Sequence, residues 1–188
     1  MAGTKTKENK MYSGVIDSAM KLGTSFAPFK AKSKKAVDVG QYQNLSSIAG
    51  NYRTPSSFKQ LGALTTPYGG STKYEGKHPG VDLANKIGTP IPSFTGGTVV
   101  GVESGFRKGD KGFGNSVIVR DAQGNMVRYS HLNNAYVKVG QQVKPGAIIG
   151  AMGNTGSTYS TSGGTGSHLD LRIKDARGNY IDPNKYLS

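Results

Sequence analysis

The sequence predicts a mostly β protein built on an antiparallel sheet or sandwich, and two observations support this fold class. Short runs rich in β-branched and aromatic residues follow one another closely after residue 61, with turn-forming glycines between them. Of the 28 glycines in the chain, 23 lie in residues 61–188. Helical periodicity is almost absent from the same region, so the sequence provides few helices to connect parallel strands.

Six runs are expected to be strands, and turn signals separate them. The expected strands are residues 98–102, 116–120, 126–131, 136–139, 147–152 and 169–174. The separators are residues 105–114, 121–124, 140–146 and 153–166. The last separator has the composition of a flexible linker. Because only about twenty residues follow it, we expect instead a long loop that returns to the same sheet.

Residues 1–60 differ from the rest of the chain in composition. They carry ten Lys and Arg against three Asp and Glu, a net charge of +7 out of the +13 of the whole chain. An imperfect apolar face predicts one helix near residues 11–22. We therefore expect a basic, partly helical N-terminal arm over residues 1–60, used for docking or as a linker, and a separate domain over residues 61–188.

Composition limits the chemistry that the chain can perform. There is no cysteine, which excludes disulfides, thiolate ligands and a cysteine nucleophile. Any metal must be held by Asp, Glu or the three histidines His78, His131 and His168. No apolar run reaches the length of a membrane span. The first thirty residues contain no recognisable export signal, because polar residues interrupt their only apolar run.

The excess of positive charge suits any polyanion, including nucleic acid and anionic cell-wall polymers. Nucleic-acid binding has no other support, since the sequence contains no helix-turn-helix, zinc-finger or basic-aromatic stacking pattern. Specific nucleic-acid partners are therefore not expected.

The three histidines lie in short motifs that contain the residue types of a metal site. His78 and Asp82 flank a Pro-Gly turn, and His168 and Asp170 point to the same face of a predicted strand because side chains alternate. His131 ends another predicted strand. Taken alone, each motif also fits an exposed turn, a structural histidine or a polar strand face. Together they offer the three or four nitrogen and oxygen donors that a zinc ion takes.

Four segments carry a family resemblance: "HPGVDLANKIGTPIPSFTGGTVV", "GFGNSVIVRDAQGNMVRYSHLNNAYVKVGQQVKPGAIIGAMGNTG", "GTGSHLDLRI" and "YIDPNKYL". They contain an H-x-x-x-D motif, a Tyr-x-His-Leu strand end and a closing Asp-Pro. In this order, residues 67–187 resemble the peptidase domain of lysostaphin-type zinc metalloendopeptidases, which are peptidoglycan hydrolases. The resemblance implies an antiparallel β fold and hydrolysis of peptide bonds in bacterial cell walls.

The resemblance also implies roles for individual residues. His78 and Asp82 correspond to two zinc ligands, and Asp170 stands where the family has a third ligand, a histidine. His131 and His168 correspond to catalytic histidines, one accepting a proton and the other assisting the oxyanion or the leaving amine, with the assignment open. Substrate contacts are expected from Tyr68, Tyr74 and Asn115. The loops at residues 105–114 and 153–166 would form the walls of a substrate groove.

Aspartate at position 170 alters the electrostatics of the expected site. Two carboxylates and one neutral imidazole reduce the formal charge at a divalent ion to zero, where the usual ligand set leaves +1. A less positive centre polarises a carbonyl less and activates water less. Oxygen-rich ligation also favours Mn²⁺ or another hard cation beside Zn²⁺.

Two functions remain open at this point. The first is a peptidoglycan endopeptidase carried in a bacteriophage virion or tail, which would bring it to the cell wall without an export signal, with residues 1–60 docking onto neighbouring virion proteins. The alternative is a catalytically weakened or inactive family member that is a structural or wall-binding component of a virion. The presence of both His131 and His168 favours the enzyme.

Overall fold

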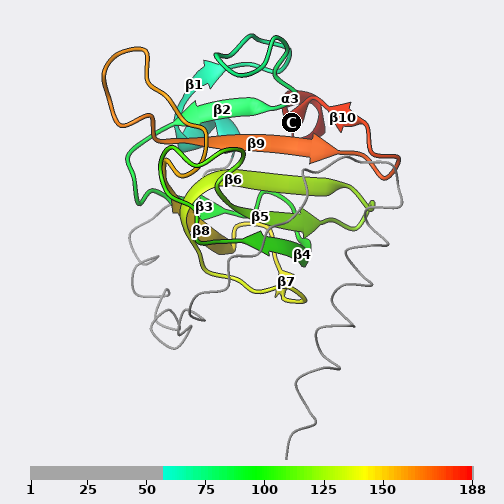
Figure 1. The fold of residues 1–188 in the computed structure, drawn as a ribbon. Coiled ribbons are helices and arrows are strands. Elements are labelled where there is room, and N and C mark those ends of the chain that lie inside the picture. Colours follow the sequence, from blue (N-terminus) through cyan, green and yellow to red (C-terminus); the bar gives the residue numbers. More distant parts are fainter. Residues whose placement is uncertain (1–56, 188) are drawn as a thin grey trace, which may run out of the picture.

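In the computed structural model, which describes residues 57–187, all the named strands join into one sheet (Figure 1). Neighbouring strands are antiparallel throughout the sheet. The strands are β1 (Ala63–Thr66), β2 (Val81–Ala84), β3 (Pro90–Pro92), β4 (Gly97–Glu103), β5 (Asn115–Arg120), β6 (Met126–Ala135), β7 (Gln142–Val143), β8 (Ile148–Met152), β9 (His168–Lys174) and β10 (Tyr180–Ile181). The mostly β, antiparallel fold class is confirmed.

The main path through the sheet runs β1-β2-β9-β6-β5-β4-β7, with β10 beside β9 and with β8 between β3 and β6. Two short helices complete the described part: η2 (Phe58–Leu61) before β1 and α3 (Pro183–Tyr186) at the C-terminal end. Asp182 caps α3 by accepting a hydrogen bond from the backbone N–H of Asn184. No helix within residues 57–187 has the length and apolarity needed to cross a membrane.

The core forms because apolar side chains alternate along the central strands. In β9, Leu169, Leu171 and Ile173 are fully buried and His168 and Asp170 alternate with them. Phe58, from η2, is also buried in this core, although it precedes the expected domain boundary at residue 61. The helix expected near residues 11–22 lies outside the described residues, and the division into arm and domain stays a prediction.

Five of the six predicted strands are present as β4, β5, β6, β8 and β9, with small differences at their ends. The sixth prediction, a strand over residues 136–139, is wrong: these residues form a connection between β6 and β7. Tyr136 donates one backbone hydrogen bond to Ile149, and the side chain of Val137 packs in the core. The apolar, β-branched Val137 is therefore buried without being part of a strand, which explains why the composition suggested a strand here. The loop at 153–166 connects β8 to β9 and thus returns to the same sheet, as predicted.

Strand β6 changes partner in its middle, and this positions the site. Its first half pairs with β9 as far as Ser130, and its second half pairs with β8 from Leu132 onward. Opposite β5 the register shifts, so that one extra residue of β6 lies between the pairs formed by Tyr129 and Leu132. This is a β-bulge, a feature that redirects side chains. His131 lies at the bulge.

Candidate metal centre and its histidines

The two aspartates of the predicted site face each other across adjacent strands. Asp82 in β2 and Asp170 in β9 are Cα partners in the antiparallel register. Both are buried, with 8% and 2% of their surface exposed. Like charges directly opposite each other destabilise a strand pair. A cation between the two carboxylates would remove that repulsion.

His78 completes the cluster from the turn that precedes β2. One ligand atom each from His78, Asp82 and Asp170 lies within 4.8 Å of the other two. His78 Nε2 is 3.1 Å from Asp82 Oδ1 and 3.7 Å from Asp170 Oδ1. The structure therefore brings together the three residues predicted as ligands.

Two atoms of this cluster are buried without a hydrogen-bond partner in the described structure: His78 Nε2 and Asp82 Oδ1. Buried polar atoms are normally paired, because desolvation without compensation is costly. A divalent ion bound by nitrogen and carboxylate oxygen would satisfy both atoms. The donor set therefore fits zinc, with three protein ligands.

Glu75 fixes the tautomer of His78. The Nδ1–H of His78 donates to Glu75 Oε2 at 2.9 Å, which leaves Nε2 directed at the aspartates. Burial lowers the pKa of His78, but the carboxylates of Asp82 and Asp170 outweigh burial and raise that pKa above its ordinary value. Burial likewise raises the pKa of Asp82, and the neighbouring His78 and His168 reverse the shift and lower it. The negative field that produces the rise at His78 also favours a cation.

The bulge in β6 turns His131 toward the cluster. Strict alternation from the buried Tyr129 would send His131 into the core, but His131 adopts φ 60°, the one positive φ outside glycine in residues 57–187. A left-handed conformation in a side chain of this size is strained by about 1–3 kcal/mol and is typical of functional sites. His131 Nε2 consequently lies 4.0 Å from Asp170 Oδ2.

The second histidine of the pair, His168, lies beside His131. Their ring centroids are 4.7 Å apart, and His168 Nε2 is 3.9 Å from Asp82 Oδ1. Each Nδ1 donates to a backbone carbonyl: that of His131 to Thr155 at 2.7 Å and that of His168 to Gly166 at 2.9 Å. In both imidazoles Nδ1 is therefore bound to backbone and Nε2 lies on the side of the two aspartates. Burial, followed by the charge of His168, lowers the pKa of His131 to about 4.

Two charged residues at the site were missed by the sequence analysis. Arg172 donates from Nε to both carboxylate oxygens of Asp170, at 2.9 and 2.8 Å, and from its terminal nitrogens to Glu75 at 2.8 and 2.9 Å. Strand alternation could have identified Arg172, which is two residues after Asp170 and on the same face. Glu75 lies in a loop, and no sequence pattern indicates its position.

The residues expected to contact substrate have different surroundings. Tyr68 packs partly against the core, and its hydroxyl donates to the carbonyl of Tyr180 at 3.2 Å. Tyr74 is 53% exposed and packs edge-on against Tyr159 of the 153–166 loop. The side chain of Asn115 is buried, accepts from the N–H of Phe106 and donates to the carbonyl of Asn133. The amide of Asn115 therefore links the 105–114 loop to β6, and substrate contacts by all three residues stay predictions.

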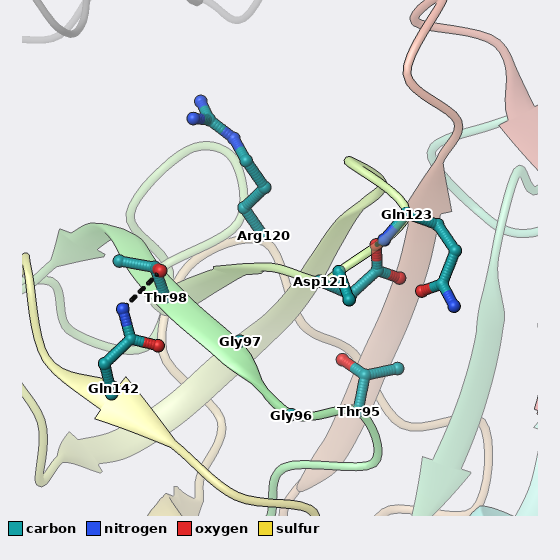
Figure 2. Close-up of a pocket in the computed structure, with 9 residues that line it drawn as sticks. Thr95, Gly96, Gly97, Thr98, Arg120, Asp121, Gln123 and Gln142 are labelled. Carbon is teal, nitrogen blue, oxygen red and sulfur yellow. Dashed lines mark hydrogen bonds between the residues drawn. The ribbon is translucent and has the colours of Figure 1, made fainter.

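A pocket of about 420 Å³ lies away from the metal cluster (Figure 2). It is lined by Thr95–Thr98, Arg120–Gln123 and Gln142, which lie where β4 begins and β5 ends. The metal cluster lies near the opposite end of β5. Gln142 donates a hydrogen bond to Thr98 across the pocket wall at 2.8 Å. His78, Asp82 and Asp170, the group within residues 57–187 whose ligand atoms could hold a metal, do not line this pocket.

Comparison with known proteins agrees with this geometry. The model of peptidase family M23 matches residues 76–183. The peptidoglycan DD-endopeptidase ShyA of Vibrio cholerae is 38% identical over 102 residues, which cover 54% of this chain and 21% of ShyA. The murein hydrolase activator NlpD of Escherichia coli is 31% identical over 113 residues, covering 60% of this chain and 27% of NlpD. The chain thus matches only about a quarter of the length of these relatives.

Solved structures show the same fold. Lysostaphin from Staphylococcus simulans, described as an antimicrobial peptidase, superposes with a TM-score of 0.55 at 31% identity, covering 70% of this chain and 51% of lysostaphin. The catalytic domain of the prophage-encoded M23 protein EnpA from Enterococcus faecalis gives a TM-score of 0.51 at 28% identity, covering 65% of this chain and 89% of that domain. With its sheet, its metal cluster and the match over residues 76–183, the chain belongs to peptidase family M23, the lysostaphin-type zinc metallopeptidases.

Proposed function

We propose that this protein is a metal-dependent endopeptidase that hydrolyses peptide bonds in peptidoglycan. The observation that carries the proposal is the cluster of His78, Asp82 and Asp170, in which two buried donor atoms have no hydrogen-bond partner and two imidazoles present Nε2 from beside them. The relative ShyA is named as a peptidoglycan DD-endopeptidase, which supports the substrate class.

His78, Asp82 and Asp170 would hold one zinc ion, and Mn²⁺ or another hard divalent cation is the alternative. The bound ion supplies Lewis-acid polarisation of the scissile carbonyl. His131 is the proposed proton acceptor, because its Nδ1–H donates to the carbonyl of Thr155 and leaves the Nε2 lone pair to take a proton from the attacking water. For His168 to donate a hydrogen bond to the developing oxyanion or a proton to the leaving amine, its Nε2 must carry a proton in addition to the Nδ1–H that binds Gly166.

In this proposal the loops at 105–114 and 153–166 form walls of the substrate groove. Backbone hydrogen bonds tie the two loops together, from Gly109 N–H to the carbonyl of Gly156 and from Ser157 N–H to that of Gly112. Tyr68 and Tyr74 are the candidates for substrate contact. Residues 61–188 carry 14 Lys and Arg against 8 Asp and Glu, a net +6 that complements anionic wall polymers.

For the location of the activity we propose a bacteriophage virion or tail, with the basic residues 1–60 docking onto neighbouring virion proteins. The prophage origin of EnpA and the +7 charge of residues 1–60 support this proposal. Mass spectrometry of purified phage particles would test it. The protein should be present in particles, and its absence from them would reject the virion role.

A second candidate function is a catalytically weakened, wall-binding family member. It is favoured by the ion pair between Asp170 and Arg172 at the metal cluster, and the relative NlpD is named as an activator of murein hydrolases. A digestion assay distinguishes the two candidates.

The assay measures new amino groups released from purified peptidoglycan by metal-stripped protein after zinc is restored. Zinc-loaded wild type should release peptides, and Asp170→Ala should lose at least about 100-fold in rate, because a ligand is removed. Asp170→His should retain activity. If neither wild type nor Asp170→His releases amino groups while both bind zinc, the enzyme proposal is rejected and the wall-binding role is favoured.

A further inference from the structure

Arg172 and Glu75 form a connected set of hydrogen bonds around the metal cluster. Arg172 binds both oxygens of Asp170 and both oxygens of Glu75. The same Glu75 accepts from His78 Nδ1. One uninterrupted path thus joins two of the three candidate ligands, His78 and Asp170, through groups that do not themselves point into the cluster.

This arrangement is enclosed rather than a surface ion pair. Arg172 is 7% exposed and Asp170 only 2%, whereas the Glu75 side chain is 32% exposed. The guanidinium of Arg172 lies 4.6 Å from the centroid of the Phe113 ring. Gly80 leaves room for the Arg172 side chain, since a Cβ at that position would lie 2.7 Å from Arg172 Cγ. Side chains packed in this way lose little further freedom on binding an ion.

The physical need for Arg172 follows from Asp170. Asp170 is buried and directly opposite Asp82, so the repulsion between the two carboxylates would turn its side chain away if no positive charge faced it. The two terminal nitrogens of Arg172 bind the carboxylate of Glu75 through two parallel bonds, which fixes the plane of the guanidinium, and its Nε donates to both oxygens of Asp170. Each carboxylate oxygen has two lone pairs, so the bond from Arg172 leaves Asp170 Oδ1 able to bind a metal.

We propose that Arg172 and Glu75 are positioning residues specific to a metal centre that uses aspartate at position 170. Arg172 holds the carboxylate of Asp170 with Oδ1 toward His78 Nε2, and Glu75 holds both Arg172 and the Nδ1-protonated tautomer of His78. A histidine at position 170 would have no carboxylate for Arg172 to orient. This inference rests on the metal-binding part of the proposed function and not on hydrolysis.

The test measures zinc affinity of the full-length protein by competition with a chromophoric chelator, in the absence of peptidoglycan. Arg172→Gln should weaken zinc binding by about 10–100-fold, the usual effect of removing a group that orients a ligand. Arg128→Gln is the matched control. Arg128 is buried, is the Cα partner of Arg172 and lies at the same distance from Phe113, but its ion pair is with Glu103. Its substitution should leave zinc affinity unchanged.

A double-mutant cycle separates positioning from general stability. In the Asp170→His background, Arg172→Gln should change zinc affinity by less than about threefold, because the two substitutions act through the same contact. Equal losses in both backgrounds, or no loss in wild type, would overturn the proposal. Arg172→Lys, which keeps the charge but not the fork, should give an intermediate zinc affinity. If Arg172→Gln does not fold, shown by the absence of a cooperative unfolding transition, Arg172→Lys takes its place in the test.

The two proposals fail in different ways. Zinc-loaded protein that shows the Arg172 coupling but releases nothing from peptidoglycan would reject the hydrolase and retain the positioning role. Peptidoglycan cleavage together with a zinc affinity that Arg172→Gln does not change would retain the hydrolase and reject the positioning role. Wild-type protein that binds no zinc would overturn both.

Discussion

The histidines at the site differ in how their positions are fixed, and His131 depends most on its surroundings. Its ring is 6% exposed, its Nδ1 donates to Thr155, and its backbone is held in a left-handed conformation by the bulge in β6. Burial and the neighbouring His168 lower its pKa to about 4. An imidazole held neutral in this way has an unprotonated Nε2 at neutral pH. Its protonation at lower pH destabilises the folded protein.

The lowered pKa of His131 predicts how the stability of metal-free protein changes with pH. The unfolded chain protonates His131 near 6.5 and the folded protein only near 4. Between these values the unfolded state binds more protons, so the free energy of unfolding should fall as the pH falls, by about 3 kcal/mol in total. Above about pH 6.5 His131 should contribute no pH dependence.

Urea unfolding of wild type and His131→Gln in the presence of chelator, from pH 4 to pH 8, checks this prediction. The pH dependence caused by His78 and Asp82 is present in both proteins, so their difference isolates His131. The wild-type curve should be steeper below about pH 6.5. Parallel curves over the whole range would show that His131 titrates normally in the folded protein.

Among the elements, the two glycine-rich loops matter as much as the strands. Gly156 donates its N–H to the carbonyl of Arg107, and its own carbonyl accepts from Gly109, so the 153–166 loop packs directly on the 105–114 loop. The neighbouring Thr155 receives the Nδ1–H of His131 and donates its hydroxyl to Leu132. The contact between the loops therefore determines where the imidazole of His131 lies.

Two glycines of one loop provide a matched test of this contact. Both Gly156 and Gly163 adopt φ 78°. A Cβ on Gly156 would lie 2.4 Å from Gly114 N, whereas a Cβ on Gly163 would meet nothing within 4 Å. Gly163→Ala should cost about 1–2 kcal/mol from the left-handed backbone alone. Gly156→Ala should cost about 1–3 kcal/mol more from the added clash.

The same pair separates loop packing from metal binding. Gly156→Ala should also lower the rate of peptidoglycan hydrolysis by displacing the Thr155 carbonyl, while zinc affinity stays within about threefold of wild type because the ligands are on other elements. Thermal unfolding, zinc competition and amine release measure the three quantities. Equal behaviour of the two alanine variants would mean that the contact between the loops has no role in the site.

At the scale of the whole molecule, the sheet topology brings distant segments together. His78 and Asp82 lie at β2, Asp170 lies on β9, and His131 lies on β6, and the order β2-β9-β6 places these three strands side by side (Figure 1). Alternation along β2 and β9 directs Asp82 and Asp170 to one face and the leucines into the core, and the bulge in β6 turns His131 to the same cluster. The site is a product of register, since a shift of one residue in β9 would bury Asp170 among leucines.

Much of this could be predicted from the sequence, for identifiable reasons. Five strands and the three residues of the candidate metal cluster were predicted from alternation, turn residues and the family motifs. The β-bulge at His131 could not be predicted, because Tyr-Ser-His fits a regular strand equally well. Residues 136–139, wrongly predicted as a strand, have the composition of a strand, but Val137 packs in the core from a connection that forms no strand ladder. Glu75 escaped prediction because its contacts with His78 and Arg172 depend on the path of a loop.

The measurement that tests the metal centre most directly is anomalous X-ray diffraction at the zinc edge, from crystals of the protein loaded with one equivalent of zinc. We expect one strong peak bonded to His78 Nε2 and to the carboxylates of Asp82 and Asp170, at about 2.0–2.2 Å, with Arg172 still bound to Asp170. A peak elsewhere, or the absence of a peak at this cluster in zinc-loaded crystals, would show that these three residues do not form the metal centre.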